Sequence, residues 1–282
     1  MKKSYHVCLW MPKDYPHSLG LFELAVLLKS TFDTLGVSCS LKLNQLEENK
    51  INIILAWHLV KMDSSLMNYS YIPYQLEQLT RLRDQTKNSP DYFKNMEAVL
   101  RHAYAVWDYS PENIDFLKGL DIHARYVPIG YHSALEQIAD RTQKDIDILF
   151  YGSRDERRNR ILDALNHLPN IRTHLLFGCY GKERDAFISR SKIIWNIHNE
   201  GTDQFEQVRI SYLLNNRCFI LSEPSEFYPY PEVEIPFISA DKLAEKSLFY
   251  LSNPDTMNML RKKSHEQFKT HYPMKTILEN TL

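Results

Sequence analysis

The sequence predicts an α/β protein of two domains, each built around a parallel sheet. Short apolar runs typical of buried strands alternate with segments of helical periodicity, which is the pattern of repeated βα units. The length, 282 residues, is enough for two domains. The alternation starts again at Asp145, after the charged segment 137–144 (QIADRTQK), which we expect to be the linker. These observations predict a first domain over residues 1–136 and a second over 145–272.

Six strands and three helices are expected in the first domain. The apolar runs that predict its strands are 6–11, 37–43, 51–57, 71–78, 105–110 and 125–130. Pro73 lies inside the fourth run, and because proline cannot donate to a strand ladder, we expect that strand near an edge of the sheet. The expected helices are 19–35, which stops before a glycine, 90–104, and 111–119, which opens with a proline.

The second domain repeats the alternation. Its expected strands are 145–152, 173–177, 193–197 and 218–221. Its expected helices are 156–168, 183–190, 243–251, 255–271 and one that starts near Asp203. A proline-rich loop covers 224–236, and Pro273 separates the last of these helices from a tail, 273–282. The repetition of the pattern is the main reason for expecting two similar domains.

The composition argues against several classes of function. A formal net charge of −1 gives no strong sign of binding to nucleic acid or to an anionic membrane. The fingerprint GxGxxG of dinucleotide-binding sites does not occur in the sequence. The four cysteines are scattered and have no CxxC spacing for zinc, which favours a reduced, cytoplasmic setting. The N-terminal apolar run is too short for a signal peptide, and no run of about 18 apolar residues predicts a transmembrane segment.

The segment 192–223 is expected to carry the main binding site. It is expected to form a strand, a polar loop, a helix and a second strand. A helix that starts at the carboxyl end of a parallel strand directs free N–H groups into the cleft there, which suits a phosphate. Glu206, in the first turn, would accept hydrogen bonds from ribose hydroxyls, and Arg209 would help to balance charge. Alternatively, Asp203 and Glu206 form a capping box, in which Glu206 only caps its own helix and pairs with Arg209.

The same segment resembles the nucleotide-sugar site of GT-B glycosyltransferases. The resemblance lies in the pattern NIH…GTD.FE..R…LL…C.ILSE over residues 196–223. Three segments of the first half, YQLEQL, VWDYSPEN and VPIGY, resemble the N-terminal domain of a subgroup of these enzymes. The resemblance implies two Rossmann-like domains that face each other across a cleft, with the tail packed back towards the first. It also implies a glycosyltransferase that moves a sugar from a nucleotide-diphosphate sugar to an unidentified acceptor.

Residues that follow two strands of the second domain would bind this donor. Gly152, Ser153 and Arg154 would offer backbone N–H groups and a guanidinium to a diphosphate. The complete set of expected donor-binding residues is Gly152, Ser153, Arg154, Asn196, His198, Gly201, Thr202, Asp203, Glu206 and Arg209. A lone histidine such as His198 is more often structural, which is the alternative for that residue. The neighbouring Arg158 and Arg160 are expected on a solvated helix face.

His17 is the candidate catalytic residue. It lies in the first strand–helix loop, which in GT-B enzymes approaches the acceptor or the transferred sugar. An inverting transferase needs a base to take the acceptor proton, whereas a retaining enzyme does not, so the role of His17 stays open. Glu77 and Gln78, at the end of the fourth expected strand, are expected to line the cleft on the acceptor side. The alternative for both is ordinary polarity at a strand end.

The resemblance to metal-independent GT-B enzymes implies that no metal is required, and no cofactor is expected, because the nucleotide sugar is a co-substrate. Asp145-Ile146-Asp147 matches the DxD pattern of metal-dependent transferases, but it opens a buried strand beside the linker instead of following the carboxyl end of one. A helix dipole and basic side chains would stabilise the departing diphosphate. Aromatic residues in strands usually pack in the core, and the expected core tryptophans are Trp57, Trp107 and Trp195.

Two other functions stay open at this point. A nucleotide-sugar epimerase of the same fold would need several acid–base residues around one sugar, and the sequence shows no dense cluster of them. A non-catalytic relative that binds a nucleotide sugar is compatible with the short first domain. Turnover of the donor without an acceptor would indicate a transferase or an epimerase, and binding without turnover under any acceptor would indicate the non-catalytic relative.

Overall fold

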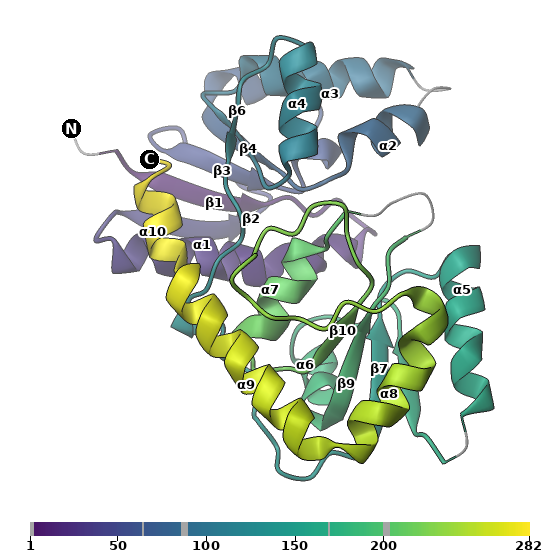
Figure 1. The fold of residues 1–282 in the computed structure, drawn as a ribbon. Coiled ribbons are helices and arrows are strands. Elements are labelled where there is room, and N and C mark those ends of the chain that lie inside the picture. Colours follow the sequence, from purple (N-terminus) through teal and green to yellow (C-terminus); the bar gives the residue numbers. More distant parts are fainter. Residues whose placement is uncertain (1–2, 64, 86–89, 169, 200–203) are drawn as a thin grey trace. The chain divides into compact units, whose positions relative to one another are not determined.

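The structure is a computed structural model that describes residues 3–63, 65–85, 90–168, 170–199 and 204–282 (Figure 1). The chain divides into two compact units. The first consists of Met1–Ile129 with Met274–Leu282, and the second of Gly130–Pro273. Each unit has one parallel sheet with helices packed on it, so the predicted α/β class is confirmed.

The first unit has a six-stranded sheet in the order β2-β1-β3-β4-β5-β6. Its strands are β1 (Tyr5–Leu9), β2 (Cys39–Leu43), β3 (Ile51–Leu55), β4 (Ser70–Gln75), β5 (Val106–Asp108) and β6 (Ala124–Tyr126). β2 pairs with one side of β1 and β3 pairs with the other. The strand order therefore reverses between β1 and β3, and the carboxyl ends of strands at such a reversal form a crevice where open α/β sheets bind ligands.

The helices of the first unit are α1 (Phe22–Thr34), α2 (Leu79–Gln85), α3 (Pro90–His102), α4 (Pro111–Gly119) and α10 (Met274–Glu279). Local sequence explains the start of α4, because the Ser110 hydroxyl accepts a hydrogen bond from the backbone N–H of Asn113 and Pro111 fits the first turn. α1 starts later than predicted because a 3-10 turn, Pro16–Leu21, precedes it. α2 has no counterpart among the predicted helices.

The prediction that the strand containing Pro73 lies near an edge is wrong, because β4 lies between β3 and β5. The ladder from β4 to β3 includes Pro73, whereas the ladder to β5 starts only at Tyr74. The carbonyl of Tyr71 accepts a hydrogen bond from the N–H of Tyr104, just before β5, so the backbone of Pro73 faces the same side. The missing N–H of proline is tolerated there because it precedes the β4–β5 ladder.

The second unit has a four-stranded sheet in the order β10-β9-β7-β8. Its strands are β7 (Ile146–Tyr151), β8 (Thr173–Leu176), β9 (Ser191–Asn196) and β10 (Ile220–Ser222). Its helices are α5 (Glu156–Asp163), α6 (Gly181–Arg190), α7 (Gln207–Asn215), α8 (Leu243–Ser252) and α9 (Pro254–His271). β8 and β9 pair with opposite sides of β7, so this sheet reverses its strand order between β7 and β9.

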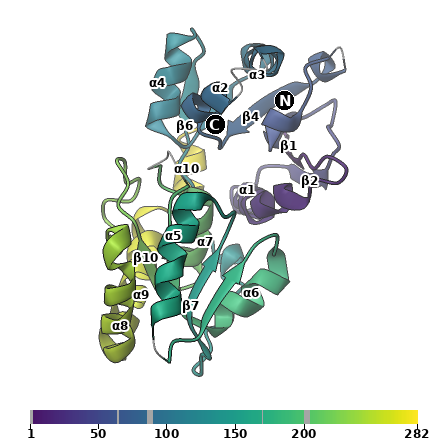
Figure 2. The same ribbon diagram turned by 90° about the vertical axis from the view of Figure 1, so that its right-hand side faces the viewer.

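Helices cover both faces of the second sheet (Figures 1 and 2). Leu149, Ile194 and Ile220 point to the face covered by α6, α7 and α9, and their strand neighbours point to the face covered by α5 and α8. Strands buried on both faces have nearly continuous apolar sequences, which is why they were visible in the sequence. The three tryptophans expected in the core, Trp57, Trp107 and Trp195, are each about 1% exposed or less, which confirms that expectation.

Residues 130–144 belong to the second unit, although the domain prediction assigns 130–136 to the first. The backbone N–H of His132 donates to the side-chain carbonyl of Asn215 over 3.1 Å. The backbone N–H of Gln137 donates to the side-chain carbonyl of Asn216 over 2.8 Å. Polar side chains at the end of α7 therefore hold this segment, and the apolar pattern of the sequence contains no sign of them.

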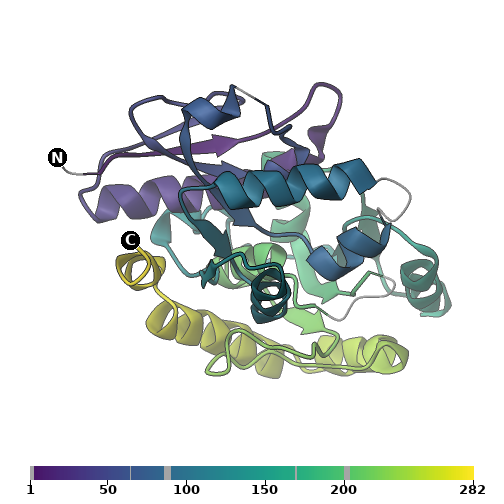
Figure 3. The ribbon, with the colours of Figure 1, turned by 90° about the horizontal axis from the view of Figure 1, so that it is seen from above.

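The C-terminal tail belongs to the first unit, where α10 packs against α1 (Figure 3). Met274 and Leu278 of α10 are fully buried. The guanidinium of Arg125 also donates a hydrogen bond to the carbonyl of Thr281. The first unit is therefore completed by residues from both ends of the sequence.

Candidate functional site

The candidate site lies in the second unit, at the carboxyl ends of β7, β9 and β10. The loops that leave β7 and β9 diverge there, because the strand order reverses between these two strands. Polar residues occupy each loop, and α7 begins beside them. This edge of the sheet is where ligands bind in doubly wound α/β folds.

Glu206 is the residue immediately before α7, and its carboxylate joins the loops together. It accepts hydrogen bonds from Asn196 Nδ2 over 2.7 Å, from His198 Nδ1 over 3.1 Å and from Arg158 Nη2 over 3.3 Å. Within the described residues, its side chain caps no N–H of α7, so the capping-box alternative is wrong for Glu206. The side chain remains 22% exposed. A partly exposed carboxylate with fixed orientation can accept further hydrogen bonds from a ligand.

Asn196 connects Glu206 to Arg209. Its amide N–H group also donates to the Ser222 hydroxyl over 3.0 Å, and its carbonyl oxygen accepts from Arg209 Nη1 over 2.8 Å. The Arg209 guanidinium lies 5.2 Å from the ring centre of Tyr151. Arg209 thus reaches Glu206 through Asn196, which differs from the direct pairing considered in the capping alternative.

Gly152 makes room for Arg209. A Cβ atom at this position would lie 2.7 Å from Arg209 Nη2, and the backbone φ of +145° is one that residues with side chains rarely adopt. Glycine is therefore required at the end of β7 for two separate reasons. Gly152 was expected to expose backbone N–H groups, and the structure shows in addition that its missing side chain leaves space for Arg209.

His198 is buried and its two ring nitrogens both have partners. Nδ1 pairs with Glu206, and Nε2 lies 3.1 Å from the carbonyl oxygen of Pro224. Burial alone lowers the pKa of His198, but the hydrogen bond and charge of Glu206 outweigh burial and hold this pKa above its usual value. A protonated ring, donating from both nitrogens, satisfies both oxygen acceptors. Its backbone N–H also donates to Glu223 over 2.8 Å.

The same contacts affect Glu206. Burial alone raises the pKa of this carboxyl group, but the hydrogen bond from His198 and the charge of Arg209 hold it below its usual value. The contact between Glu206 and His198 therefore favours the ionised form of both groups.

The prediction that Arg158 lies on a solvated helix face is wrong, because Arg158 is 1% exposed. Its Nη2 donates to the carbonyl oxygen of Ile197 over 2.6 Å and its Nη1 to that of Ser153 over 2.9 Å. Burial and then the charge of Arg209 lower the pKa of Arg158 to about 10, so it stays protonated at neutral pH. It ties the β7 loop to the β9 loop and to Glu206.

Arg157 and Glu223 form a second ion pair that the sequence did not indicate. Glu223 follows β10 and is buried, and both of its oxygens face the Arg157 guanidinium. Arg157 Nη1 also donates to the carbonyl of His198 over 3.0 Å. One signal was available: Asp155, at the start of α5, accepts from the backbone N–H of Arg158 over 2.7 Å and fixes which arginines face the sheet. Arg160 is exposed, as expected.

Three arginines gather in this site. Arg157 pairs with Glu223 and Arg158 with Glu206, whereas Arg209 donates to the amide oxygen of Asn196. Guanidinium groups at the end of a parallel sheet suit an anionic ligand such as a phosphate.

Two of the expected donor-binding residues lie at the rim. Ser153 is exposed, and its hydroxyl contacts Asn199 Oδ1 over 3.3 Å. Arg154 is also exposed, and its Nε donates to Asn159 over 2.7 Å, on the surface of α5. The remaining expected donor-binding residues, Gly201, Thr202 and Asp203, lie outside the described residues.

The expected acceptor-side residues belong to the first unit. His17 is exposed in the turn before α1, with its ring edge-on to Tyr15 at 5.2 Å. Glu77 and Gln78 follow β4, and the Glu77 carboxylate lies 3.7 Å from Nδ1 of His58. His58 was not among the candidates, because its loop has no sequence motif.

The two acids of the DxD pattern make ion pairs at the amino end of β7. Asp145 accepts from Arg190 over 2.5 and 2.8 Å. Asp147 accepts from Lys192 over 2.6 Å, and Arg172 lies 3.4 Å away. Both acids therefore balance structural cations. Among the described residues, no group of three or more His, Cys, Asp or Glu side chains could hold a metal ion.

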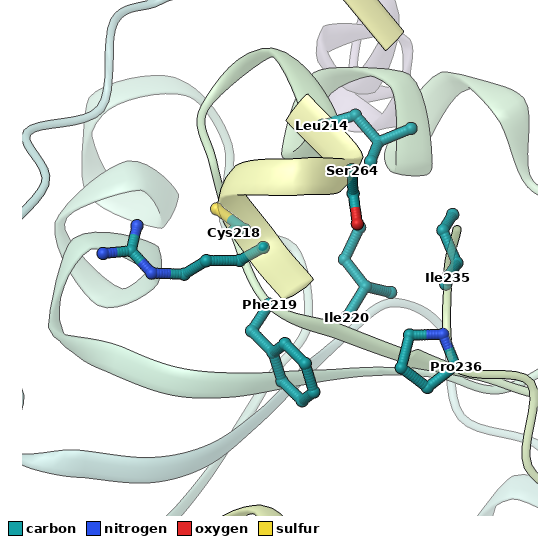
Figure 4. Close-up of a pocket in the computed structure, with 8 residues that line it drawn as sticks. Leu214, Cys218, Phe219, Ile220, Ile235, Pro236 and Ser264 are labelled. Atoms are coloured by element: carbon teal, nitrogen blue, oxygen red, sulfur yellow. The ribbon is translucent and has the colours of Figure 1, made fainter. Parts of the chain in front are cut away.

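A small apolar crevice lies between β10 and α9, lined by side chains that include Leu214, Phe219 and Ile235 (Figure 4). It has essentially no space for a water molecule. Cys218 lies on its wall, and burial raises the pKa of this thiol to about 12. The crevice is therefore a packing feature and Cys218 is a core residue. In the part of the chain that the structure describes, none of the helices has the length and apolar character needed to span a membrane.

Comparison with known sequences gives distant relatives. No protein-family model matches the chain. Uncharacterized protein L137 of Acanthamoeba polyphaga mimivirus is 27% identical over 94% of this chain, which corresponds to 36% of the relative. Uncharacterized protein L140 of the same virus is 26% identical over 61% of this chain and 59% of its own length. The chain thus spans about a third of the first relative and just under three fifths of the second.

Comparison with solved structures identifies the fold. Anabaena HepE, crystallised with UDP and glucose, matches with a TM-score of 0.61 at 9% identity, over 99% of this chain and 98% of HepE. A glycosyltransferase from Rickettsia africae matches with a TM-score of 0.55 at 11% identity, over 99% and 97%. An α1,3-fucosyltransferase crystallised with GDP-fucose matches with a TM-score of 0.51 at 14% identity, over 99% and 88%. The chain has the fold of the GT-B glycosyltransferases.

Proposed function

We propose that the chain is a glycosyltransferase whose second unit binds a nucleotide-diphosphate sugar. The observation that carries the proposal is Glu206, a partly exposed carboxylate at the strand-order reversal of a parallel sheet, held by three donors. A carboxylate so placed can accept the two hydroxyls of a ribose. The fold supports the proposal, because HepE and the fucosyltransferase were crystallised with UDP and GDP-fucose.

The diphosphate would bind beside the arginines of the site. Arg209 lies against Gly152 at the end of β7, and Arg157 and Arg158 lie close by. When the sugar leaves, negative charge develops on the diphosphate, and fixed cationic donors stabilise that charge. We therefore propose that the reaction needs no metal ion. Gly201, Thr202 and Asp203 remain proposed contacts of the donor.

Ligand binding tests the proposal directly. A ligand that binds the folded state raises the melting temperature, so UDP, GDP, UDP-glucose and GDP-fucose should be compared by thermal shift and titration calorimetry. We expect one of the diphosphates to bind and the Glu206→Ala variant to lose that binding. Glu245→Ala, on an exposed position of α8, is the matched control and should bind like the parent. Equal binding by the Glu206→Ala variant would refute the site.

Turnover then separates transfer from the other two functions. A transferase releases nucleoside diphosphate and forms a glycosylated acceptor, whereas an epimerase converts one nucleotide sugar into another. Binding without turnover across a panel of sugar, glycerol and phenolic acceptors would indicate a non-catalytic binding protein. Mass spectrometry of the donor and acceptor pools distinguishes all three results.

A further inference from the structure

The first unit has its own polar pair at the carboxyl ends of β3 and β4, two neighbouring strands of its sheet. His58 follows β3 in a single 3-10 turn, Trp57–Leu59, and Glu77 follows the neighbouring β4. Nδ1 of His58 lies 3.7 Å from Oε1 of Glu77. The His58 side chain is 15% exposed and that of Glu77 is 44% exposed. An imidazole is thus partly enclosed beside a carboxylate, at the edge where α/β sheets bind ligands.

Two backbone features fix the position of His58. Ala56, directly after β3, has left-handed backbone angles of φ 56° and ψ 31°, which cost free energy in a residue other than glycine. The Tyr92 hydroxyl, on α3, donates a hydrogen bond to the carbonyl of His58 over 3.2 Å. Strained backbone of this kind persists where surrounding contacts enforce it, and it is concentrated at functional sites.

An aromatic residue of α3 lies beside this pair. The Tyr92 hydroxyl contacts the backbone of His58, and burial and then the charge of Glu77 raise the pKa of Tyr92. An aromatic ring near a carboxylate and an imidazole offers both an apolar face and hydrogen-bonding groups, which together suit a hydroxylated ligand such as a sugar.

We propose that His58, oriented by Glu77, is the general base of the first unit and takes the proton of an acceptor hydroxyl. This inference rests on the proposed transferase function. In the step, the hydroxyl proton moves to a ring nitrogen of His58 and the hydroxyl oxygen bonds to the anomeric carbon of the donor. The bond from that carbon to the phosphate oxygen breaks, and its electron pair leaves with the nucleoside diphosphate. A single displacement of this kind inverts the anomeric centre.

His58 fits this role better than His17, the residue expected from the sequence. A general base needs a fixed position and a neighbour that orients it. His58 has the Glu77 carboxylate at 3.7 Å and a backbone held by Tyr92, whereas His17 is exposed and meets Tyr15 ring edge to ring face. Burial lowers the pKa of His58, and Glu77 opposes this, so the ring is predominantly neutral at pH 7 and can accept a proton.

Kinetics of the full chain test the assignment, with UDP-glucose and GDP-fucose as donors and water as the acceptor. We expect the His58→Gln variant to release nucleoside diphosphate at least 100-fold more slowly than the parent, since general-base catalysis typically contributes about 10²–10⁴-fold. Its affinity for UDP and GDP should stay within twofold of the parent. His123→Gln, an exposed histidine at the amino end of β6, should change neither quantity. An unchanged rate for the His58→Gln variant, or a product with retained anomeric configuration, would overturn the proposal.

The pH profile separates a base from a residue that only supports the loop. A base must be deprotonated, so the rate should fall as pH decreases through the pKa of His58. Glu77 is the charged group facing His58. Glu77→Gln removes the charge that favours the imidazolium, so the acidic limb should move to lower pH. An unmoved limb would contradict the role of Glu77.

A readout without turnover decides the pairing independently of the proposed function. Titration of the histidine ring signals by NMR, assigned with the His58→Gln variant, should give His58 a pKa below the usual value and a lower one again in the Glu77→Gln variant. If His58 titrates identically in both proteins, the pairing is wrong. If the nucleotides do not bind at all, the proposed function fails while the titration still reports on the pair.

Discussion

Two histidines, one in each unit, lie just beyond the carboxyl ends of parallel strands beside a glutamate, yet their environments differ. His198 donates from both ring nitrogens, at 3.1 Å to Glu206 and 3.1 Å to a carbonyl, and its pKa is raised. His58 lies 3.7 Å from Glu77, and burial lowers its pKa. The surroundings therefore favour the protonated ring for His198 and the neutral ring for His58.

The difference follows from how fully each glutamate is enclosed. Glu206 is 22% exposed and has three donors, whereas Glu77 is 44% exposed, so solvent screens its charge. A fixed charge suits the binding of an anionic group, and a neutral imidazole suits proton transfer. The difference is consistent with the two proposed roles, nucleotide binding in the second unit and proton transfer in the first.

The largest effect is expected from Arg158→Met, which removes the guanidinium on which the second site is built. Its loss leaves the carbonyl of Ile197 without its buried donor and removes one of the three donors of Glu206. Breaking a buried pair by removing one partner costs about 3–5 kcal/mol. Urea unfolding should show a loss of that size. Arg160→Met, on the exposed side of the same helix, should change the free energy of unfolding by less than about 0.5 kcal/mol.

Gly152→Ala should have a smaller effect and should sharpen the account of Arg209. The added Cβ meets Arg209 Nη2 and the backbone keeps an unfavourable φ, so we expect a loss of about 1–3 kcal/mol in the free energy of unfolding. Calorimetry should also show weaker nucleotide binding, since Arg209 must move. Gly119→Ala is the control, because among the described residues nothing lies within 4 Å of its added Cβ. Normal nucleotide affinity in Gly152→Ala would separate Arg209 from the site.

The pH dependence of stability should have opposite signs for the two histidines. The folded pKa of His198 is raised, so its stabilising contribution is present below about pH 6.5 and is lost as pH rises through the folded pKa. The folded pKa of His58 is lowered, so its contribution is present above about pH 6.5 and is lost as pH falls through the folded pKa. Melting temperatures of the His198→Gln and His58→Gln variants, measured from pH 5 to 9, should diverge from the parent at opposite ends of that range. Divergence at the same end would remove the distinction between the sites.

The smallest effect is expected from removing divalent metal ions. Because cationic side chains face the proposed diphosphate position, EDTA should leave nucleotide affinity within twofold. Asp147→Asn should also bind nucleotide normally, since Asp147 pairs with Lys192 at the amino end of β7. A requirement for Mg²⁺ or Mn²⁺ in calorimetry would show that the cationic residues are insufficient.

The elements of the fold could be predicted because buried parallel strands are apolar along their whole length. Both repeats of the βα pattern were visible for that reason, and Gly152, Asn196 and His198 were placed correctly at strand ends. Glu206 was expected in the first turn of a helix that starts near Asp203, but α7 starts at Gln207 and Glu206 lies just before it. The sequence did not show which strands and side chains pair with one another. Whether Pro73 is tolerated in a central strand depends on where β5 begins, and whether Arg158 is buried depends on how Asp155 caps α5.

His58 was missed for a related reason. Its neighbour Glu77 lies on the next strand of the sheet, 19 positions away in the sequence, so spacing alone cannot connect them. Glu206 shows the complementary error, since its distance from Asp203 is that of a capping box while its carboxylate turns to Asn196 and His198. Local spacing identifies which residues stand at an edge, and sheet register decides which of them meet.

The assembly of the first unit from both ends of the sequence has a consequence for biosynthesis. The second unit is continuous in the chain, whereas the first lacks α10 until the ribosome has translated residues 274–282. Domains usually mature in the order in which they emerge. Here the second unit can fold before the first is complete, because the apolar surface of α1 stays uncovered until α10 has been synthesised. We therefore expect nascent chains that stall before residue 274 to bind chaperones.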